Sequence, residues 1–194
     1  MVMNTDRKWI VVRIDGRIAS ISTDYAALAA ISAKLAQLKS PIYRKITAET
    51  VAFEDVWDIR HKAGWDDMIL FGTEFQKKVW RRLFEMTHEE DGSPKTPRLI
   101  SYSDFADMCQ NKAGVRAVAH AIGLNPVSVL IPCHLVIPKE SIDYIKGVQK
   151  KAESTIFKGD DISMEKLLQD KGIDFGEYAL GRKLKRALIQ KELS

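Results

Sequence analysis

Residues 100–126 restrict the possible folds of this chain more than any other segment. Two short stretches with helical spacing, SYSDFADMCQ (101–110) and GVRAVAHAIG (114–123), are separated only by a turn-like NKA. A pair of helices joined by so short a turn is the helix-turn-helix arrangement. The Asn-Pro pair at 125–126 ends it, because proline disfavours helix at the preceding residue. The expected core contacts of the pair are Phe105, Ala106, Val118 and Ile122.

The segment that follows contains the most reactive side chains. VSVLI (127–131) is expected to run as a short buried strand or extended segment into the Pro-Cys-His of residues 132–134. The 194 residues include only two cysteines and four scattered histidines, which gives neither a disulfide framework nor zinc-ligand spacing. Cys133 is therefore either a buried structural thiol or a nucleophile coupled to a base. Cys109, in the first helix of the pair, is expected to be a core residue.

The rest of the sequence indicates an α+β fold with two domains. The first, residues 1–70, is expected to be a small N-terminal α/β scaffold. It combines a hairpin (8–14 and 17–22) with a helix (24–40) and an ambiguous strand after residue 44. The second, residues 71–194, is expected to be mainly helical and to contain the helix-turn-helix and the reactive cysteine.

Further helices are expected at both ends of the second domain. Thr73 is a suitable N-cap for a helix over residues 72–86. One helical face of that segment carries Phe75, Val79, Trp80 and Leu83. The stretch 139–177 is lysine-rich, with one helix expected at 163–172. Residues 179–194 are typical of a basic amphipathic helix.

Composition excludes some classes of protein. Hydrophobic residues make up 45% and charged residues 29% of the chain, as in ordinary globular proteins, and no apolar run is long enough to span a membrane. The first residues lack the layout of a signal peptide, so we expect a cytoplasmic protein. The formal net charge of +4 mildly favours an anionic partner such as nucleic acid.

In several collinear stretches the chain resembles the O6-alkylguanine-DNA alkyltransferases, also called methylated-DNA–protein-cysteine methyltransferases. The stretches are GTEFQKKVW (72–80), ISYSDFA (100–106), VRAVAHAIGLNPVSVLIPCH (115–134), GEYALG (176–181) and LIQKE (188–192). The resemblance implies direct-reversal DNA repair, in which O6-alkylguanine, and O4-alkylthymine as a second substrate, loses its alkyl group irreversibly to Cys133. A thiolate suits this reaction because it is a soft, strong nucleophile.

The resemblance also implies roles for residues around Cys133. His134 would take the thiol proton through a water molecule, Glu192 would orient and stabilise His134, and Asn125 would brace the turn behind the cysteine. The flipped base would be held by the backbone carbonyls of Cys133 and Val136, by Tyr178, and by the backbone N–H of Ala179. No cofactor and no metal are expected.

The DNA contacts implied by the resemblance come from the helix-turn-helix, which would bind double-stranded DNA through the minor groove as a monomer. Arg116 would enter the base stack, and Tyr102 would crowd the phosphate beside the flipped nucleotide and hydrogen-bond the base. Lys112 would meet a phosphate. Small residues would let the second helix approach the DNA closely: Gly114, Ala117 and Ala121.

The sequence departs from the family pattern in two places. Leu135 stands where the family usually has an arginine, and residues 139–174 contain an insertion between the cysteine and the pocket tyrosine. Two alternatives to repair therefore stay open. A non-catalytic alkylated-DNA-binding or regulatory protein on the same scaffold predicts binding without transfer, and a cysteine hydrolase predicts turnover with release of product.

Overall fold

The computed structural model describes residues 7–36, 45–89, 93–154, 170 and 173–193. Its contacts divide the chain into two compact units. The first comprises Met1–Lys95 and Leu124–Cys133, and the second comprises Thr96–Gly123 and His134–Ser194. Both units are therefore discontinuous in sequence. The domain boundary predicted between residues 70 and 71 is not tested by this division and stays a prediction.

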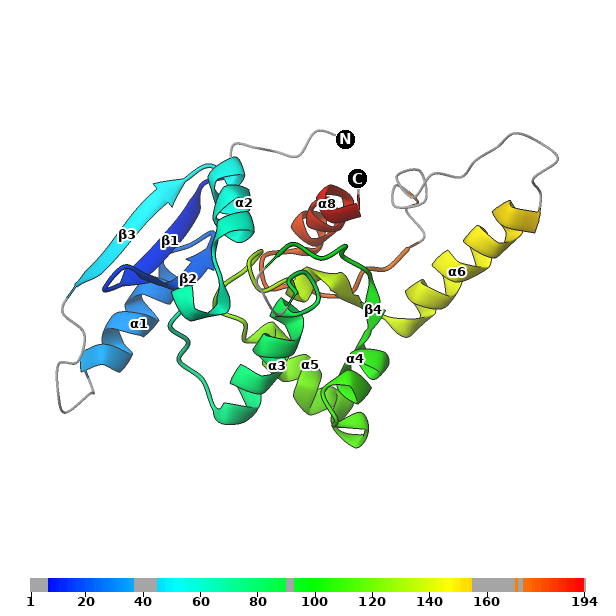
Figure 1. Cartoon of the computed structure of the whole chain (residues 1–194), viewed down its shortest axis with the longest axis horizontal. Helices are drawn as coiled ribbons and strands as arrows, with labels where there is room; N and C mark the ends of the chain where they lie inside the picture. The colour runs from blue at the N-terminus through cyan, green and yellow to red at the C-terminus, as the bar shows by residue number, and fades with distance from the viewer. Residues whose placement is uncertain (1–6, 37–44, 90–92, 155–169, 171–172, 194) are drawn as a thin grey trace. The chain divides into compact units, whose positions relative to one another are not determined.

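The first unit is built on a three-stranded antiparallel sheet with the order β2-β1-β3 (Figure 1). β1 (Trp9–Ile14) and β2 (Arg17–Ser22) form the predicted hairpin, and β3 (Ile46–Val51) pairs with the other edge of β1. The hairpin turns at Asp15 and Gly16, both of which have positive φ angles, 49° and 85°. Asp-Gly adopts this two-residue turn at low cost, which is why the hairpin could be predicted.

Helices complete the first unit in the part of the chain that the structure describes. Ile31 of α1 (Ala26–Ala36) shares an apolar core with Ile10 and Val12 of β1. α2 (Phe53–Lys62) was not predicted from the sequence, and it leads through the 3-10 turn η1 (Trp65–Asp67) towards α3.

The predicted helix α3 (Glu74–Phe84) is confirmed, and so is its N-cap. Thr73 Oγ1 accepts a hydrogen bond from the Gln76 backbone N–H, while Gln76 Oε1 accepts one from the Thr73 N–H. Val79, Trp80 and Leu83 are buried as predicted. Phe75 lies one helical turn before Val79 on the same face, but 38% of its surface is exposed. It follows the cap by only two residues, before the buried face begins.

The second unit contains the predicted helix-turn-helix. α4 (Tyr102–Met108) and α5 (Val115–Gly123) are joined through the 3-10 turn η2 (Lys112–Gly114), and they contact each other. All four expected core residues are buried: Phe105, Ala106, Val118 and Ile122. A Cβ at Gly114 would lie 2.4 Å from the Asn111 side-chain oxygen, so a larger residue there would require the Asn111 side chain to move. Cys109, at the C-cap of α4, is buried as expected.

The remaining elements of the second unit surround a small apolar core. β4 (Ile100–Ser101) pairs in parallel with β5 (Val136–Ile137), and α6 (Lys139–Ser154) and α8 (Arg182–Leu193) follow. The core consists of Ile137, Ile142, Ile145, Ile173, Phe175 and Ile189. α8 confirms the predicted C-terminal helix, whereas α6 was not predicted. The helix expected at 163–172 lies outside the described residues. In the part of the chain that is described, no helix has the length and apolar character that a membrane crossing demands.

Candidate active site

Cys133 opens the 3-10 turn η3 (Cys133–Leu135), with 7% of its surface exposed. The Asn125 side chain donates from Nδ2 to Cys133 Sγ at 3.1 Å and to the Ile131 carbonyl oxygen at 2.8 Å. Its Oδ1 accepts from the Val127 backbone N–H at 3.0 Å. Asn125 therefore spans the loop behind the cysteine and also reaches the sulfur. A donor aimed at sulfur favours the thiolate over the thiol.

The loop between Asn125 and Cys133 is tightly turned. The Ile131 N–H donates to the Val127 carbonyl at 3.0 Å, and the Cys133 N–H donates to the Ile131 carbonyl at 2.8 Å. Val129, which is fully buried, has a φ of 74°. Such an angle strains a β-branched residue by about 1–3 kcal/mol and persists only where the surroundings enforce it. The interpretation of 127–131 as a simple extended segment is therefore incomplete, because a strained turn interrupts it.

His134 follows Cys133 in the chain and belongs to the second unit. Its Nε2 lies 2.8 Å from Glu192 Oε1, and the two side chains are 0% and 2% exposed. An ionised carboxylate only accepts hydrogen bonds, so Nε2 carries the proton and Nδ1 is the accepting nitrogen of the neutral ring. This is the contact that the resemblance implied, and it leaves the ring as a base whose protonated form Glu192 would stabilise.

Apart from Cys133, the residues expected to hold the base lie in the second unit. Tyr102 begins α4 and is half-buried, and Val136 in β5 is buried. Tyr178 and Ala179 lie in a turn that the hydrogen bond from the Gly181 N–H to the Tyr178 carbonyl closes at 2.9 Å. Their roles in binding stay predictions.

Lys185 is a residue of this region that the sequence analysis missed. It is 1% exposed, donates from Nζ to the Val136 carbonyl at 2.8 Å, and lies 5.7 Å from the centre of the Tyr102 ring. Lys185 therefore contacts two of the residues that are predicted to hold the base. The spacing of Lys185 was the available signal. It precedes the apolar Leu188 and Ile189 by three and four residues, so it lies on the same face of α8.

The helix-turn-helix presents part of the predicted DNA-binding set on its surface. Lys112, Arg116 and Ala117 are exposed. Ala121 is 1% exposed, so its side chain lies inside the fold, and its part in the close approach of the helix to DNA stays a prediction. Gly114 is half-buried, and its close approach to the Asn111 side chain favours a small residue there independently of DNA.

Leu135 is fully buried. A guanidinium at this position would lose its hydration, which costs several kcal/mol unless a partner compensates. Leucine instead contributes buried apolar surface, so the departure from the family pattern is consistent with the burial of the position.

Arg60 and His88 are buried basic side chains of the first unit. Burial lowers the pKa of Arg60 to about 10. His88 stacks on Phe84, and its two ring nitrogens lie 3.2 Å and 3.3 Å from the carbonyls of Phe84 and Arg60. Burial is the main cause that lowers the pKa of His88. This histidine links α2 to the end of α3.

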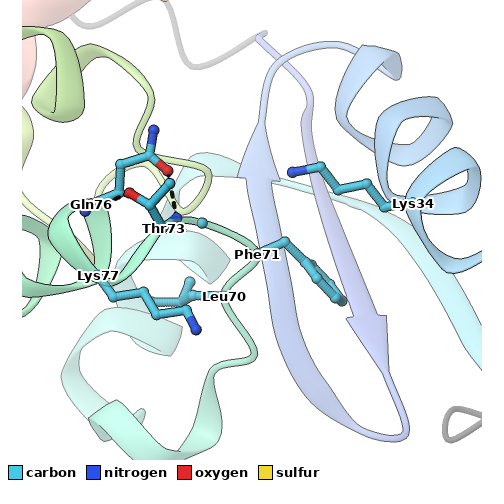
Figure 2. A pocket seen from close by; sticks show the side chains of 7 residues that line it. Lys34, Leu70, Phe71, Thr73, Gln76 and Lys77 are labelled. Carbon is cyan, nitrogen blue, oxygen red and sulfur yellow. Dashed lines mark hydrogen bonds between the residues drawn. The ribbon is translucent and has the colours of Figure 1, made fainter. Parts of the chain in front are cut away.

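A cavity of about 450 Å³ lies between α1 and the start of α3 (Figure 2). Its lining combines two cations with apolar and capping residues: Lys34, Leu70, Phe71, Gly72, Thr73, Gln76 and Lys77. None of the predicted site residues lines it, and it contains no group with the reactivity of a thiol or imidazole. We therefore assign it no part in the chemistry at Cys133.

Comparison with known proteins supports the resemblance. The family described as 6-O-methylguanine DNA methyltransferase, DNA binding domain, matches residues 74–155. Over 86 residues the chain is 41% identical to the "Probable methylated-DNA–protein-cysteine methyltransferase" of Acanthamoeba polyphaga mimivirus, covering 44% of this chain and 52% of the relative. Over 68 residues it is 47% identical to the inducible methylated-DNA–protein-cysteine methyltransferase of Bacillus subtilis, covering 35% and 34%.

The match to these two relatives spans about half and about a third of their lengths. The likeness in fold is wider. The crystal structure of O6-methylguanine-DNA methyltransferase from Pyrococcus kodakaraensis matches 96% of this chain and 93% of its own, with a TM-score of 0.52 at 21% identity. The α+β fold is thus confirmed. Over residues 74–155 the chain is therefore similar to the DNA-binding domain of the 6-O-methylguanine DNA methyltransferases.

Proposed function

We propose that this chain repairs DNA directly, by transferring the alkyl group of O6-alkylguanine to Cys133. The match of residues 74–155 to the methyltransferase family supports the proposal, and so does the Asn125 amide that donates to the cysteine sulfur. The observation that carries it is the buried His134–Glu192 pair, which begins one residue after Cys133 in the chain. A structural thiol has no need of a base held in a defined tautomer beside it.

In the proposed reaction the thiol proton passes through a water molecule to His134 Nδ1, and Glu192 stabilises the imidazolium. The sulfur then attacks the alkyl carbon. A carbon–sulfur bond forms, the bond from carbon to O6 breaks, and its electron pair leaves with guanine, which takes up one proton. The net change exchanges the thiol hydrogen for the alkyl group. The product is a thioether, which water does not hydrolyse, so each protein molecule reacts once.

The proposed substrate is double-stranded DNA, from which the damaged nucleotide is flipped out at a cost of a few kcal/mol. Arg116 is exposed on α5 and fills the vacated place in the stack, with Lys112 on a phosphate. Tyr102 contacts the flipped nucleotide, and Val136, Tyr178 and Ala179 hold its base. The minor groove suits this task because its readout is largely independent of sequence.

The proposed setting is the cytoplasm, where thiols stay reduced, and neither Cys109 nor Cys133 forms a disulfide. The proposed reaction needs no metal or cofactor. It consumes one protein molecule for each lesion.

The test is mass spectrometry after incubation with a duplex that contains one O6-methylguanine. The expected product carries one methyl group on the peptide that contains Cys133, at one equivalent per protein, and Cys133→Ala gives none. Tight binding to the duplex without any gain of mass would reject transfer and leave the non-catalytic alternative. Catalytic release of a product would instead indicate a hydrolase.

A further inference from the structure

Ser20 is a polar residue in the middle of an otherwise apolar buried stretch of β2. Only 1% of its surface is exposed, and its neighbours Ala19 and Ile21 are equally buried. A buried hydroxyl costs roughly 1–3 kcal/mol unless it is hydrogen-bonded. The partner of this hydroxyl therefore indicates why a serine occupies the position.

The Ser20 hydroxyl donates to the carbonyl oxygen of Pro126 at 2.9 Å. The same carbonyl accepts the Ile21 backbone N–H at 3.0 Å, and the Ser128 N–H donates to the Ile21 carbonyl at 3.1 Å. Ile21 and Val127 form a parallel bridge. Residues 126–128 thus run along the edge of β2 as a short additional strand within the first unit.

An irregularity in the hairpin lies directly beside Ser20. Val12 pairs with Ser20, but the next residue, Arg13, pairs with Ile18, so Ala19 is the extra residue of a β-bulge. Bulges redirect the side chains next to them and recur near active sites. Here the bulge immediately precedes the one hydroxyl that bonds the Pro126 carbonyl.

Pro126 stands between the two residues that define the geometry at the sulfur. On one side is Asn125, whose Nδ2 donates to Cys133 Sγ at 3.1 Å. On the other is Val127, whose N–H fixes the Asn125 side-chain oxygen at 3.0 Å. The direction of the Asn125 amide therefore depends on the backbone at 125–127, and two donors from β2 hold the carbonyl at its centre.

We propose that Ser20 is a positioning residue for Cys133: its hydroxyl anchors the Asn125 turn, so that the Asn125 amide stays directed at the sulfur. The role in alkyl transfer rests on the proposed function, whereas the effect on thiol reactivity does not. The N-terminal sheet would then be more than a scaffold, because it sets the reactivity of a residue that follows it by more than a hundred positions.

The test compares Ser20→Ala and Ser20→Thr with a matched control, Ser22→Ala. Ser22 lies in the same strand, but its hydroxyl bonds the Asp24 carbonyl and not the loop. Two rates are measured on the whole chain: alkylation of Cys133 by iodoacetamide as a function of pH, with peptide mapping to exclude Cys109, and benzyl transfer from free O6-benzylguanine. Thermal unfolding confirms that each variant is folded.

We expect Ser20→Ala to slow both reactions about tenfold, the equivalent of one lost hydrogen bond, and to move the pH profile of iodoacetamide alkylation to higher pH. Ser20→Thr retains the hydroxyl and should keep both rates near those of the parent. Ser22→Ala should change neither rate. If Ser20→Ala does not fold, Ser20→Cys replaces it, since its thiol is a weaker donor.

Two results would overturn the proposal: a folded Ser20→Ala protein with the rates and pH profile of the parent, or an equal loss in Ser22→Ala. If the parent protein reacts with iodoacetamide but never with O6-benzylguanine, the proposed function fails, and the iodoacetamide profiles still decide the role of Ser20.

Discussion

Replacing Glu192 with glutamine tests the proposed proton path most directly. The change keeps the size of the side chain and an oxygen that can accept from His134 Nε2, but it removes the negative charge. In the parent protein the two atoms are 2.8 Å apart, and the side chains are 0% and 2% exposed. Water therefore does little to screen the interaction between the carboxylate and the imidazolium that forms when His134 takes the proton.

The expected magnitude follows from that geometry. Unit charges about 4 Å apart attract by about 4 kcal/mol at an effective dielectric constant near 20. The amide recovers about 1 kcal/mol of this through its remaining hydrogen bond. The net loss of about 3 kcal/mol corresponds to a rate lower by about 10²-fold. Stability should change by only about 1 kcal/mol, because burying the neutral amide avoids the desolvation of a carboxylate.

The assay is a single-turnover time course with free O6-benzylguanine, quenched with acid and read as the benzylated fraction of the Cys133 peptide. Free base is preferable to duplex because it removes DNA binding and base flipping from the measured rate. The matched control is Glu140→Gln, which makes the same chemical change at an exposed glutamate in the first turn of α6.

The reasoning would be refuted if folded Glu192→Gln reacted within about threefold of the parent rate, against the ~10²-fold loss expected from the lost charge. It would also be refuted if Glu140→Gln lost as much activity, since the effect would then be independent of the buried pair.

Three further predictions concern other parts of the molecule. Burial lowers the pKa of His88 below 6.5 in the folded state, so the unfolded chain binds more protons below that pH. Urea unfolding should therefore show that the stability of the protein falls from pH 7 towards pH 5. The fall should be smaller in His88→Gln. Leu135→Arg should destabilise the protein by about 3–5 kcal/mol in the same assay, whereas Leu135→Met should cost under about 1.5 kcal/mol. If the two variants lost equal stability, burial of the charge would not be the cause. Arg116→Ala should slow reaction with O6-methylguanine duplex at least about tenfold and leave the reaction with free base unchanged, because only the duplex requires flipping; equal losses on both would contradict the role of Arg116.

The elements that could be predicted from the sequence have strong local signals. Asp15-Gly16 determines the hairpin turn, Thr73 and Gln76 cap α3, and the short NKA link with its flanking apolar residues indicates the helix-turn-helix. The contacts of Asn125 and Glu192 were expected only through the resemblance. Glu192 is 58 residues from His134, and periodicity alone relates no such pair.

The missed elements lack local signals. α2 begins after Ala52, which offers no side-chain cap, and it closely follows the β-branched residues of β3, so the pattern indicated a strand. α6 contains Gly147 and only a few buried positions, so its apolar face is narrow. Lys185 was missed because a lysine is expected in solvent, although its spacing from Leu188 and Ile189 places it on the buried face of α8. The strain at Val129 is likewise imposed by the surrounding loop.

The bond between Ser20 and Pro126 also has a consequence for folding during synthesis. The two residues are 106 positions apart, so at usual rates of translation β2 waits about 5–20 s for the segment that pairs with its edge. An unpaired strand edge is a template for association with other chains. The nascent first unit therefore remains incomplete until residues 126–128 have emerged, and a ribosome stalled before that point would present an uncapped sheet to chaperones.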